Sequence, residues 1–199
     1  MPQAVAQVQQ TLRASAAVKE RICNAPEVLA AVVAAAEAMT QALIKGNKLL
    51  FFGNGGSAAD AQHVTAEFTG RFLAKGRKPL AAVALTANTS SLTAIGNDFS
   101  FDDVFAREMQ ALGQPGDVAI GISTSGRSAN VLKAFAAAKA ARVITIGLTG
   151  RDGGLMKTAA DIAVIVPSDD TQRIQESHIA IGHIWCELVE NAYLAAGSQ

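Results

Sequence analysis

Residues 48–57 read KLLFFGNGGS, an apolar run that passes directly into a loop of glycine and small polar residues. A second stretch, DVAIGISTSGRS at residues 117–128, has the same order. A strand, then a loop of glycine and hydroxyl residues, then a helix is how α/β proteins hold a phosphate, because free backbone N–H groups and the positive helix end favour an anion. The two stretches therefore predict phosphate-type loops after two parallel strands.

The rest of the chain continues this alternation. Apolar runs predict strands at 48–52, 80–85, 117–122, 142–148 and 161–166; helical patterns predict helices at 3–22, 26–45, 57–73, 89–96, 101–112, 128–140, 153–158 and 171–195. Near-continuously apolar strands joined by helices are typical of a parallel sheet covered on both faces. We therefore expect one α/β domain over residues 1–199. It should be a three-layer αβα sandwich with a five-stranded, doubly wound parallel sheet, in which residues 1–46 form extra helices packed on the core or in an oligomer.

The composition limits the function classes. Seventeen basic and 17 acidic residues give a formal net charge of zero, which argues against a dedicated nucleic-acid binder. The longest apolar stretch, residues 28–36, is shorter than the about 20 residues that span a bilayer, and the N-terminus has no signal-peptide pattern. Cys23 and Cys186 lie in helical patterns and are expected to be reduced core thiols. A cytoplasmic protein without a nucleic-acid or membrane partner is expected, and the alanine-rich helices indicate an oligomer.

The glycine loop, residues 53–58, allows two other interpretations. Its G-x-G-x-x-A spacing fits a dinucleotide-binding fingerprint, but such a site needs an acidic residue about 20 positions further on, and residues 72–85 contain none. The glycines can also form a tight turn and nothing more. A nicotinamide cofactor is therefore not expected, whereas the simple turn stays an alternative to a phosphate site.

The second loop carries four hydroxyl side chains around Gly126, namely Ser123, Thr124, Ser125 and Ser128. The alternative to phosphate binding is a helix cap at Ser125 or Ser128, which uses one hydroxyl and leaves the others unexplained. Backbone N–H groups together with several hydroxyls are the donors that a phosphate cradle needs. We therefore expect the second loop to hold a phosphate.

A cluster of metal ligands or acid/base groups is also predicted. His63 and Glu67 stand four residues apart, on one face of the helix that follows the glycine loop. Gln175 and His183 are eight residues apart and lie on broadly the same side of the last helix. Two histidines and a carboxylate, completed by a fourth ligand or water, match the donors of a zinc site. The alternative for the His63–Glu67 pair is a polar pair on a surface or an interface.

Together these motifs resemble the sugar-isomerase (SIS) domain family, and closely its bacterial phosphoheptose isomerases. The similar stretches keep their order and spacing over nearly the whole chain beyond the first helix: residues 53–57, 62–63, 67–71, 92–98, 116–117, 121–126, 148–150, 152–154, 173–176 and 183. The resemblance implies an isomerase that converts sedoheptulose 7-phosphate to D-glycero-D-manno-heptose 7-phosphate, the first step towards ADP-heptose for lipopolysaccharide. It also implies a homotetramer with active sites where subunits meet.

Carried over by position, the resemblance assigns site residues. One Zn²⁺ per subunit would be held by His63, Glu67, Gln175 and His183. The substrate would contact Asn54, Gly55, Gly56, Ser57, Glu67, Arg71, Asn97, Asp98, Ser123, Thr124, Ser125, Ser128 and Gln175, with Arg71 reaching a neighbouring subunit's site. Arg127 and Gln172 depart from residues usual in the family, which leaves the exact heptose specificity open.

An aldose–ketose isomerisation moves one proton between C1 and C2 and another between their oxygens, through an enediolate. We expect Glu67 to remove the C1 proton of the ketose and His183 to be its acid/base partner, with zinc polarising the carbonyl–hydroxyl pair. Whether Glu67 stays a zinc ligand throughout is open, because a zinc-bound carboxylate is a weaker base. The alternative function is a non-catalytic SIS-domain protein that binds phosphosugars or the replication initiator DnaA; such relatives tend to lack the glutamate and the last histidine, and this chain has both.

Overall fold

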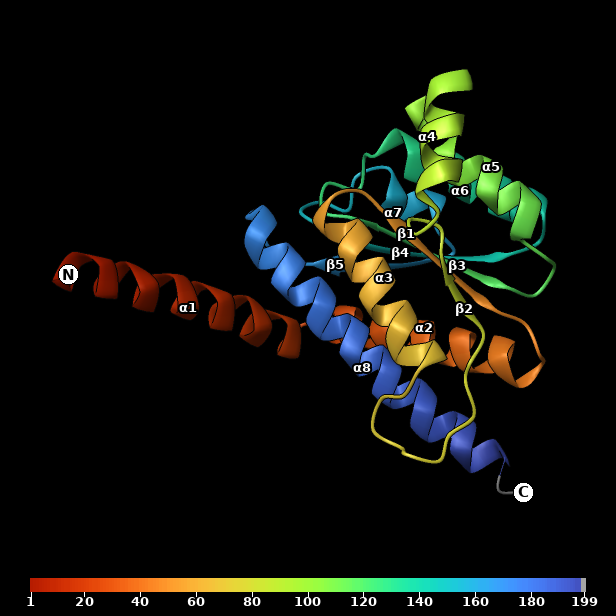
Figure 1. Cartoon of the computed structure of the whole chain (residues 1–199). Coiled ribbons are helices and arrows are strands. Elements are labelled where there is room, and N and C mark those ends of the chain that lie inside the picture. Colours follow the sequence, from red (N-terminus) through yellow and green to blue (C-terminus); the bar gives the residue numbers. More distant parts are fainter. Residues whose placement is uncertain (198–199) are drawn as a thin grey trace.

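The computed structural model describes residues 1–197 and places a parallel sheet between two layers of helices (Figure 1). Its elements are α1 (Pro2–Cys23), α2 (Pro26–Ile44), β1 (Leu49–Gly53), α3 (Gly56–Thr69), β2 (Ala82–Ala84), α4 (Thr89–Asp98), η1 (Phe101–Asp103), α5 (Val104–Leu112), β3 (Val118–Ser123), α6 (Ala129–Ala140), β4 (Ile144–Gly150), α7 (Met156–Ala159), β5 (Ile162–Val166) and α8 (Thr171–Gly197). The predicted three-layer α/β architecture with extra N-terminal helices is confirmed.

The five strands run in the order β2-β1-β3-β4-β5, and all neighbouring strands are parallel. The chain moves outward from β1 to β2 and then returns to β3 on the other side of β1, so the strand order reverses between β1 and β3. Ligands of doubly wound sheets bind at such a reversal, beyond the carboxyl ends of the strands. The glycine loop follows β1 and the serine-rich loop follows β3, and the pairing of Gly53 with Ile122 brings the two loops side by side.

The alternation of side chains along β1 divides the core into two halves. Phe51 points to the layer of α2, α3 and α8 and stacks on Phe68 of α3 at 5.9 Å between ring centroids. Phe52 points to the layer of α5 and α6 and meets Phe135 of α6 edge-on at 5.8 Å. Because the first layer contains both α3 and α8, the sheet supports these two helices next to each other (Figure 1).

Helix α2 is long and apolar enough, by length and composition alone, to cross a membrane. In the fold it packs against α8 and β5, and Val28, Val32, Met39 and Leu43 are buried. The indole N–H of Trp185 on α8 donates to the Val32 carbonyl at 3.0 Å. This helix therefore occupies the position of a core helix.

Helix α1 extends away from the body of the molecule (Figure 1). Val18, near its end, is buried, whereas Val5, Val8 and Leu12 are exposed on turns further out. Cys23, the last residue of α1, is exposed as well, and Cys186 on α8 is buried. The expectation of two core thiols is therefore correct for Cys186 and wrong for Cys23, because the last turns of α1 pack on the core through Val18 and Ile22 and leave Cys23 on the exposed side of the helix.

The predicted helices differ from the observed ones mostly by one or two residues, and the helix expected at 153–158 is observed at Met156–Ala159. Three other helices show how the limits are set. The helix expected at 57–73 ends at Thr69, because Gly70 leaves the helical backbone angles (φ −88°, ψ −107°). The helix expected at 89–96 continues to Asp98, so Asn97 and Asp98 are helical as well. The helix expected at 101–112 begins as a 3₁₀ turn, in which the Ser100 hydroxyl accepts from the Asp102 N–H at 3.1 Å.

Candidate active site

The glycine loop turns sharply between β1 and α3 and is held from two sides. Gly55 has a φ of +57°, which favours glycine, and a Cβ on Gly56 would overlap the side-chain amide of Gln175 on α8. Asn54 and Asn130 exchange two amide hydrogen bonds of 2.9 and 2.8 Å, and Asn130 is buried on α6. The sequence does not indicate Asn130 as a site residue, because its partner Asn54 lies 76 positions away and meets it only in the folded chain.

In the serine-rich loop the hydroxyl groups face one another. Ser123 is the last residue of β3, and its Oγ lies 2.8 Å from the Ser128 Oγ and 3.5 Å from the Ser125 Oγ. Ser128 occupies the N-cap position of α6 and makes no side-chain capping hydrogen bond. The helix-cap alternative is therefore not adopted by Ser128. Gly126, at φ +64°, packs so closely on the Gly153 carbonyl that a side chain has no room there.

The two loops meet around a small polar cavity of about 110 Å³. Its lining gathers seven of the predicted substrate-binding residues with Ile122: Asn54, Ser57, Ser123, Thr124, Ser125, Ser128 and Gln175. Hydroxyl and amide donors therefore converge beside the N-terminal ends of α3 and α6, where an anion is favoured.

Other predicted contact residues lie outside this cavity in the single chain. Asn97 and Asp98 are exposed at the end of α4, where the Asn97 amide donates to Asp98 at 2.8 Å. Arg71 is exposed in the segment after α3. Arg127 pairs with Asp152 at 2.7 Å beside Ser125; the Gly154 N–H holds the pKa of the Asp152 carboxyl below its usual range, and Arg127 adds to this effect.

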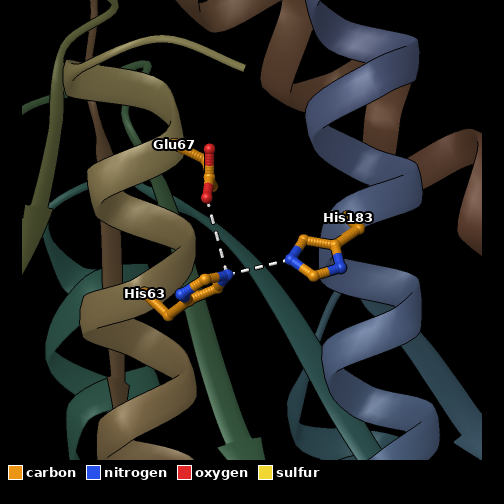
Figure 2. A group of neighbouring side chains, drawn as sticks. All are labelled: His63, Glu67 and His183. Atoms are coloured by element: carbon orange, nitrogen blue, oxygen red, sulfur yellow. Dashed lines mark hydrogen bonds and ion pairs between the residues drawn. The ribbon is translucent and has the colours of Figure 1, made fainter. Parts of the chain in front are cut away.

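A second centre lies between α3 and α8. Figure 2 shows His63 and Glu67 of α3 turned toward His183 of α8. The His63 Nε2 lies 2.9 Å from the His183 Nε2 and 3.6 Å from a Glu67 carboxylate oxygen, and one ligand atom of each residue falls within 4.8 Å of the others. Residues separated by 120 positions are thus brought to one point.

The donor set of this centre fits a zinc ion. Two donor atoms bound to zinc at their usual distances stand about 3.3 Å apart in tetrahedral geometry. The separations of 2.9 and 3.6 Å from His63 Nε2 lie on either side of that value. The side chain of His63 is 48% exposed and that of Glu67 is 25% exposed, so the centre is open to a ligand. His63, Glu67 and His183 can therefore hold a metal ion.

One aromatic residue, Phe72, and one acidic residue, Asp60, lie beside this centre. Phe72, which the sequence analysis missed, stacks on His183 with ring centroids 5.9 Å apart and an interplanar angle of 24°. Burial raises the pKa of Asp60, one turn before His63 on α3, and His63 opposes this shift. No sequence signal marks Phe72, because it lies in an irregular segment that only the tertiary fold brings to α8.

The third histidine does not belong to this centre. His178 is buried, and its Nε2 donates to the Thr149 carbonyl at the end of β4 over 3.1 Å. Burial lowers the pKa of His178 to about 4, although the hydrogen bond to Thr149 opposes the shift. His178 is therefore a neutral imidazole that links α8 to the sheet.

The phosphate-type cavity and the histidine centre lie along the same pair of helices. Gly56 contacts Gln175 at one end, and His63 contacts His183 further along. Seven positions separate Gly56 from His63 on α3, and eight separate Gln175 from His183 on α8. At the rise per residue of an α-helix, these separations correspond to about 10–12 Å. Gln175 itself lies at the cavity end, against Gly56; its predicted role as a metal ligand stays a prediction.

Comparisons with known proteins give matches over most of this chain. The SIS-domain family profile matches residues 13–150. The phosphoheptose isomerase of Rhodospirillum rubrum is 55% identical over 162 residues, which cover 81% of this chain and 86% of that protein. The structure of a phosphoheptose isomerase from Neisseria gonorrhoeae matches with a TM-score of 0.88 at 45% identity, over 94% of this chain and 99% of the other. One from Francisella tularensis matches with a TM-score of 0.90 at 35% identity, over 94% and 98% of the two chains.

Proposed function

The chain belongs to the SIS-domain family and, within it, to the phosphoheptose isomerases; we propose that it converts sedoheptulose 7-phosphate to D-glycero-D-manno-heptose 7-phosphate. The observation that carries this proposal is the pairing of a hydroxyl-lined cavity with the His63–Glu67–His183 centre on one pair of helices. The cavity supplies neutral donors for a phosphate, and the centre supplies the groups that proton transfer needs.

The spacing of the two centres supports a seven-carbon substrate. In an open-chain heptose 7-phosphate, about eight single bonds separate C1 from phosphorus, which spans roughly 9–10 Å at the rise per bond of an extended backbone. The cavity and the histidine centre are about 10–12 Å apart along α3 and α8. A pentose 5-phosphate has about six such bonds and spans roughly 7 Å. With its phosphate in the serine-rich loop, a heptose therefore brings C1 and C2 to Glu67 and His183.

The chain's own residues then account for the isomerisation. The Glu67 carboxylate takes a proton from C1 of the ketose, and the electron pair left on C1 forms the C1–C2 double bond of an enediolate. His183 moves a proton between O1 and O2, and Glu67 then gives a proton to C2, which yields the aldose. The proton count is unchanged, as an isomerisation requires. Phe72 restricts the His183 ring by stacking on one face of it.

We assign the metal site to His63, Glu67 and His183, with Gln175 as the fourth ligand and one Zn²⁺ in each subunit. When bound, zinc would polarise the carbonyl–hydroxyl pair as a Lewis acid. The chemistry of the donors supports this assignment, since imidazole nitrogens and a carboxylate oxygen are ordinary zinc ligands. Gln175 would have to turn its amide from Gly56 toward His63 to join them.

We also propose that the enzyme is a homotetramer with active sites at subunit interfaces. Exposed apolar side chains on α1, among them Val5, Val8 and Leu12, recur at helical spacing and support burial in an assembly. Arg71, Asn97 and Asp98 are predicted substrate residues that stand outside the cavity of one chain, which is consistent with contributions across an interface. A cytoplasmic location and a role in ADP-heptose synthesis for lipopolysaccharide complete the proposal.

The non-catalytic alternative, a phosphosugar-binding or DnaA-binding SIS protein, is not favoured. The similar proteins described above carry the name phosphoheptose isomerase. Glu67 and His183, the two residues that such binding proteins tend to lack, are both present here and face the same point.

The test is conversion of sedoheptulose 7-phosphate by the purified protein, followed by NMR of the sugar carbons. Untreated protein should form the aldoheptose 7-phosphate, a chelator should abolish the conversion, and added Zn²⁺ should restore it. The same protein should convert a pentulose 5-phosphate far more slowly, because its C1 cannot reach Glu67. No conversion by zinc-loaded, correctly assembled protein would overturn the proposal, and binding to a protein partner would then be tested.

A further inference from the structure

We infer that a buried ion pair, Arg77–Glu190, is a positioning device that holds Glu67 and His183 in place from behind the active site. The inference rests on the proposed function, because it assigns a purpose to residues that support those two side chains. Arg77 lies in the irregular segment after α3, and Glu190 lies on α8, seven residues beyond His183. The two side chains are 1% and 3% exposed.

Arg77 binds the end of the helix that carries Glu67. Its Nη2 donates to the backbone carbonyl of Glu67 at 3.0 Å, and its Nη1 donates to the carbonyls of Phe68 at 3.0 Å and Lys78 at 2.8 Å. A guanidinium at this position satisfies carbonyl groups that the end of α3 leaves without helical partners, and its charge suits the negative end of the helix. The backbone of Glu67 is therefore held directly by Arg77.

Glu190 binds the segment that contacts His183. One carboxylate oxygen accepts from the N–H groups of Leu73 at 2.9 Å and Ala74 at 2.8 Å, and the other accepts from the Arg77 Nε at 2.7 Å. Leu73 directly follows Phe72, whose ring stacks on His183. Seven residues are about two helical turns, so Glu190 and His183 lie on the same side of α8.

The ion pair thus links both catalytic side chains through two short paths. One path runs from Arg77 through the Glu67 backbone, and the other runs from Glu190 through Phe72 to the His183 ring. Stability alone does not explain such a pair, because removing two charges from water has a large cost that a well-packed apolar pair avoids. Catalysis does gain from it, because a displacement of about 1 Å at a catalytic group can lower turnover about a hundredfold.

Asp117 provides a matched control. Its buried carboxylate accepts from two backbone N–H groups, those of Lys48 and Gln114, at 2.9 Å each, and from the Lys48 ammonium at 2.6 Å. Glu190 likewise accepts two hydrogen bonds from backbone N–H groups and one from a cationic side chain. Asp117 lies next to the amino ends of β1 and β3, whereas both loops follow the carboxyl ends of these strands. Asp117→Asn and Glu190→Gln therefore remove comparable buried charges, one remote from the site and one behind it.

The experiment compares kcat and KM for sedoheptulose 7-phosphate at a temperature where each variant is fully folded. Both Glu190→Gln and Asp117→Asn should lower Tm. Glu190→Gln should lower kcat about tenfold while KM stays within twofold, and Asp117→Asn should keep kcat within twofold. Equal kcat in these two variants would overturn the inference.

Two further variants keep the test valid if Glu190→Gln does not fold. Arg77→Lys keeps the charge but cannot reach the same carbonyls with one ammonium, so it should lower kcat about as much as Glu190→Gln. Phe72→Leu leaves the ion pair intact and should lower kcat several-fold with an almost unchanged Tm. Wild-type kcat in both variants would contradict the two paths.

Binding of Co²⁺, followed by its visible absorption, separates this inference from the proposed function. Substituting residues that orient metal ligands typically lowers metal affinity about 10–100-fold. Glu190→Gln should therefore weaken Co²⁺ binding about tenfold, and Asp117→Asn should leave it unchanged. If the wild type binds Co²⁺ with this pattern and does not isomerise the heptose, the proposed function fails and the positioning device stands. Equal Co²⁺ affinity in the two variants would overturn the positioning device whatever the activity.

Discussion

Replacing Glu67 with glutamine should remove the chemistry and leave sugar-phosphate binding. The substitution keeps the shape of the side chain but removes the base, and positioned acid–base catalysis typically contributes about 10²–10⁴-fold. Such a loss corresponds to about 3–5 kcal/mol of barrier. The hydroxyl-lined cavity lies about 10–12 Å away along α3 and α8, so its contacts to the phosphate should not change. We therefore expect kcat to fall at least about a hundredfold and KM to change little.

The assay measures initial rates over a range of sedoheptulose 7-phosphate concentrations, with zinc content determined for each preparation, because Glu67 is also an expected ligand. Glu27→Gln, which changes an exposed carboxylate on α2, serves as the control and should keep wild-type kinetics. Glu67→Asp retains a carboxylate but withdraws it by about 1.5 Å, which should lower kcat about a hundredfold. Turnover by Glu67→Gln within a few-fold of the wild type, at equal zinc content, would refute the assignment of Glu67 as the base.

Other substitutions test the cavity, the buried histidine and the serine-rich loop. Ser128→Ala should raise KM about tenfold or more with little change in kcat, because a hydrogen bond to a charged phosphate is lost; steady-state kinetics would show an unchanged KM if the hydroxyl does not bind substrate. Burial lowers the pKa of His178 to about 4 in the folded protein, whereas the pKa of histidine in the unfolded chain is about 6.5. Between these two pH values the unfolded chain binds more protons than the folded protein, so the free energy of unfolding falls as the pH drops from 6.5 toward 4. Urea unfolding at pH 7 and pH 5 should show that His178→Gln, which can still donate to Thr149, removes about 2 kcal/mol of this pH dependence; an identical pH dependence would contradict the shift. Gly126→Ala should lower the free energy of unfolding by about 1–3 kcal/mol, because of its positive φ and the nearby Gly153 carbonyl, and an unchanged urea midpoint would show that the loop adapts.

Much of the fold could be predicted from local patterns. The apolar runs around Phe51 and Ile120 mark strands buried on both faces, and the two polar loops mark their carboxyl ends. Strands and loops of this kind are encoded over a few residues, so the periodicity of the sequence indicates them directly. The cavity between the two loops then follows from the order of the parallel strands.

The features that local patterns missed depend on partners far along the chain. The helix expected at 57–73 stops at Thr69, where Arg77 binds the carbonyl groups of Glu67 and Phe68. Glu190, more than 100 positions away, holds the N–H groups of Leu73 and Ala74 outside the helix. The approach of His63 to His183 also needs α3 and α8 side by side, which helical spacing within one helix cannot indicate. From the sequence, that centre can therefore be predicted only as a set of donor residues and, through the family resemblance, as a site.

The most direct test of the central claim is isomerisation of sedoheptulose 7-phosphate in D₂O, with the products analysed by NMR. Glu67 and His63 are partly exposed, so a proton removed from C1 should exchange with solvent before C2 is protonated. The account predicts an aldoheptose 7-phosphate that carries deuterium at C2, and loss of this product in Glu67→Gln. An aldoheptose formed without deuterium at C2 and at the same rate by the wild type and by Glu67→Gln would contradict proton transfer by Glu67 through an enediolate at this site.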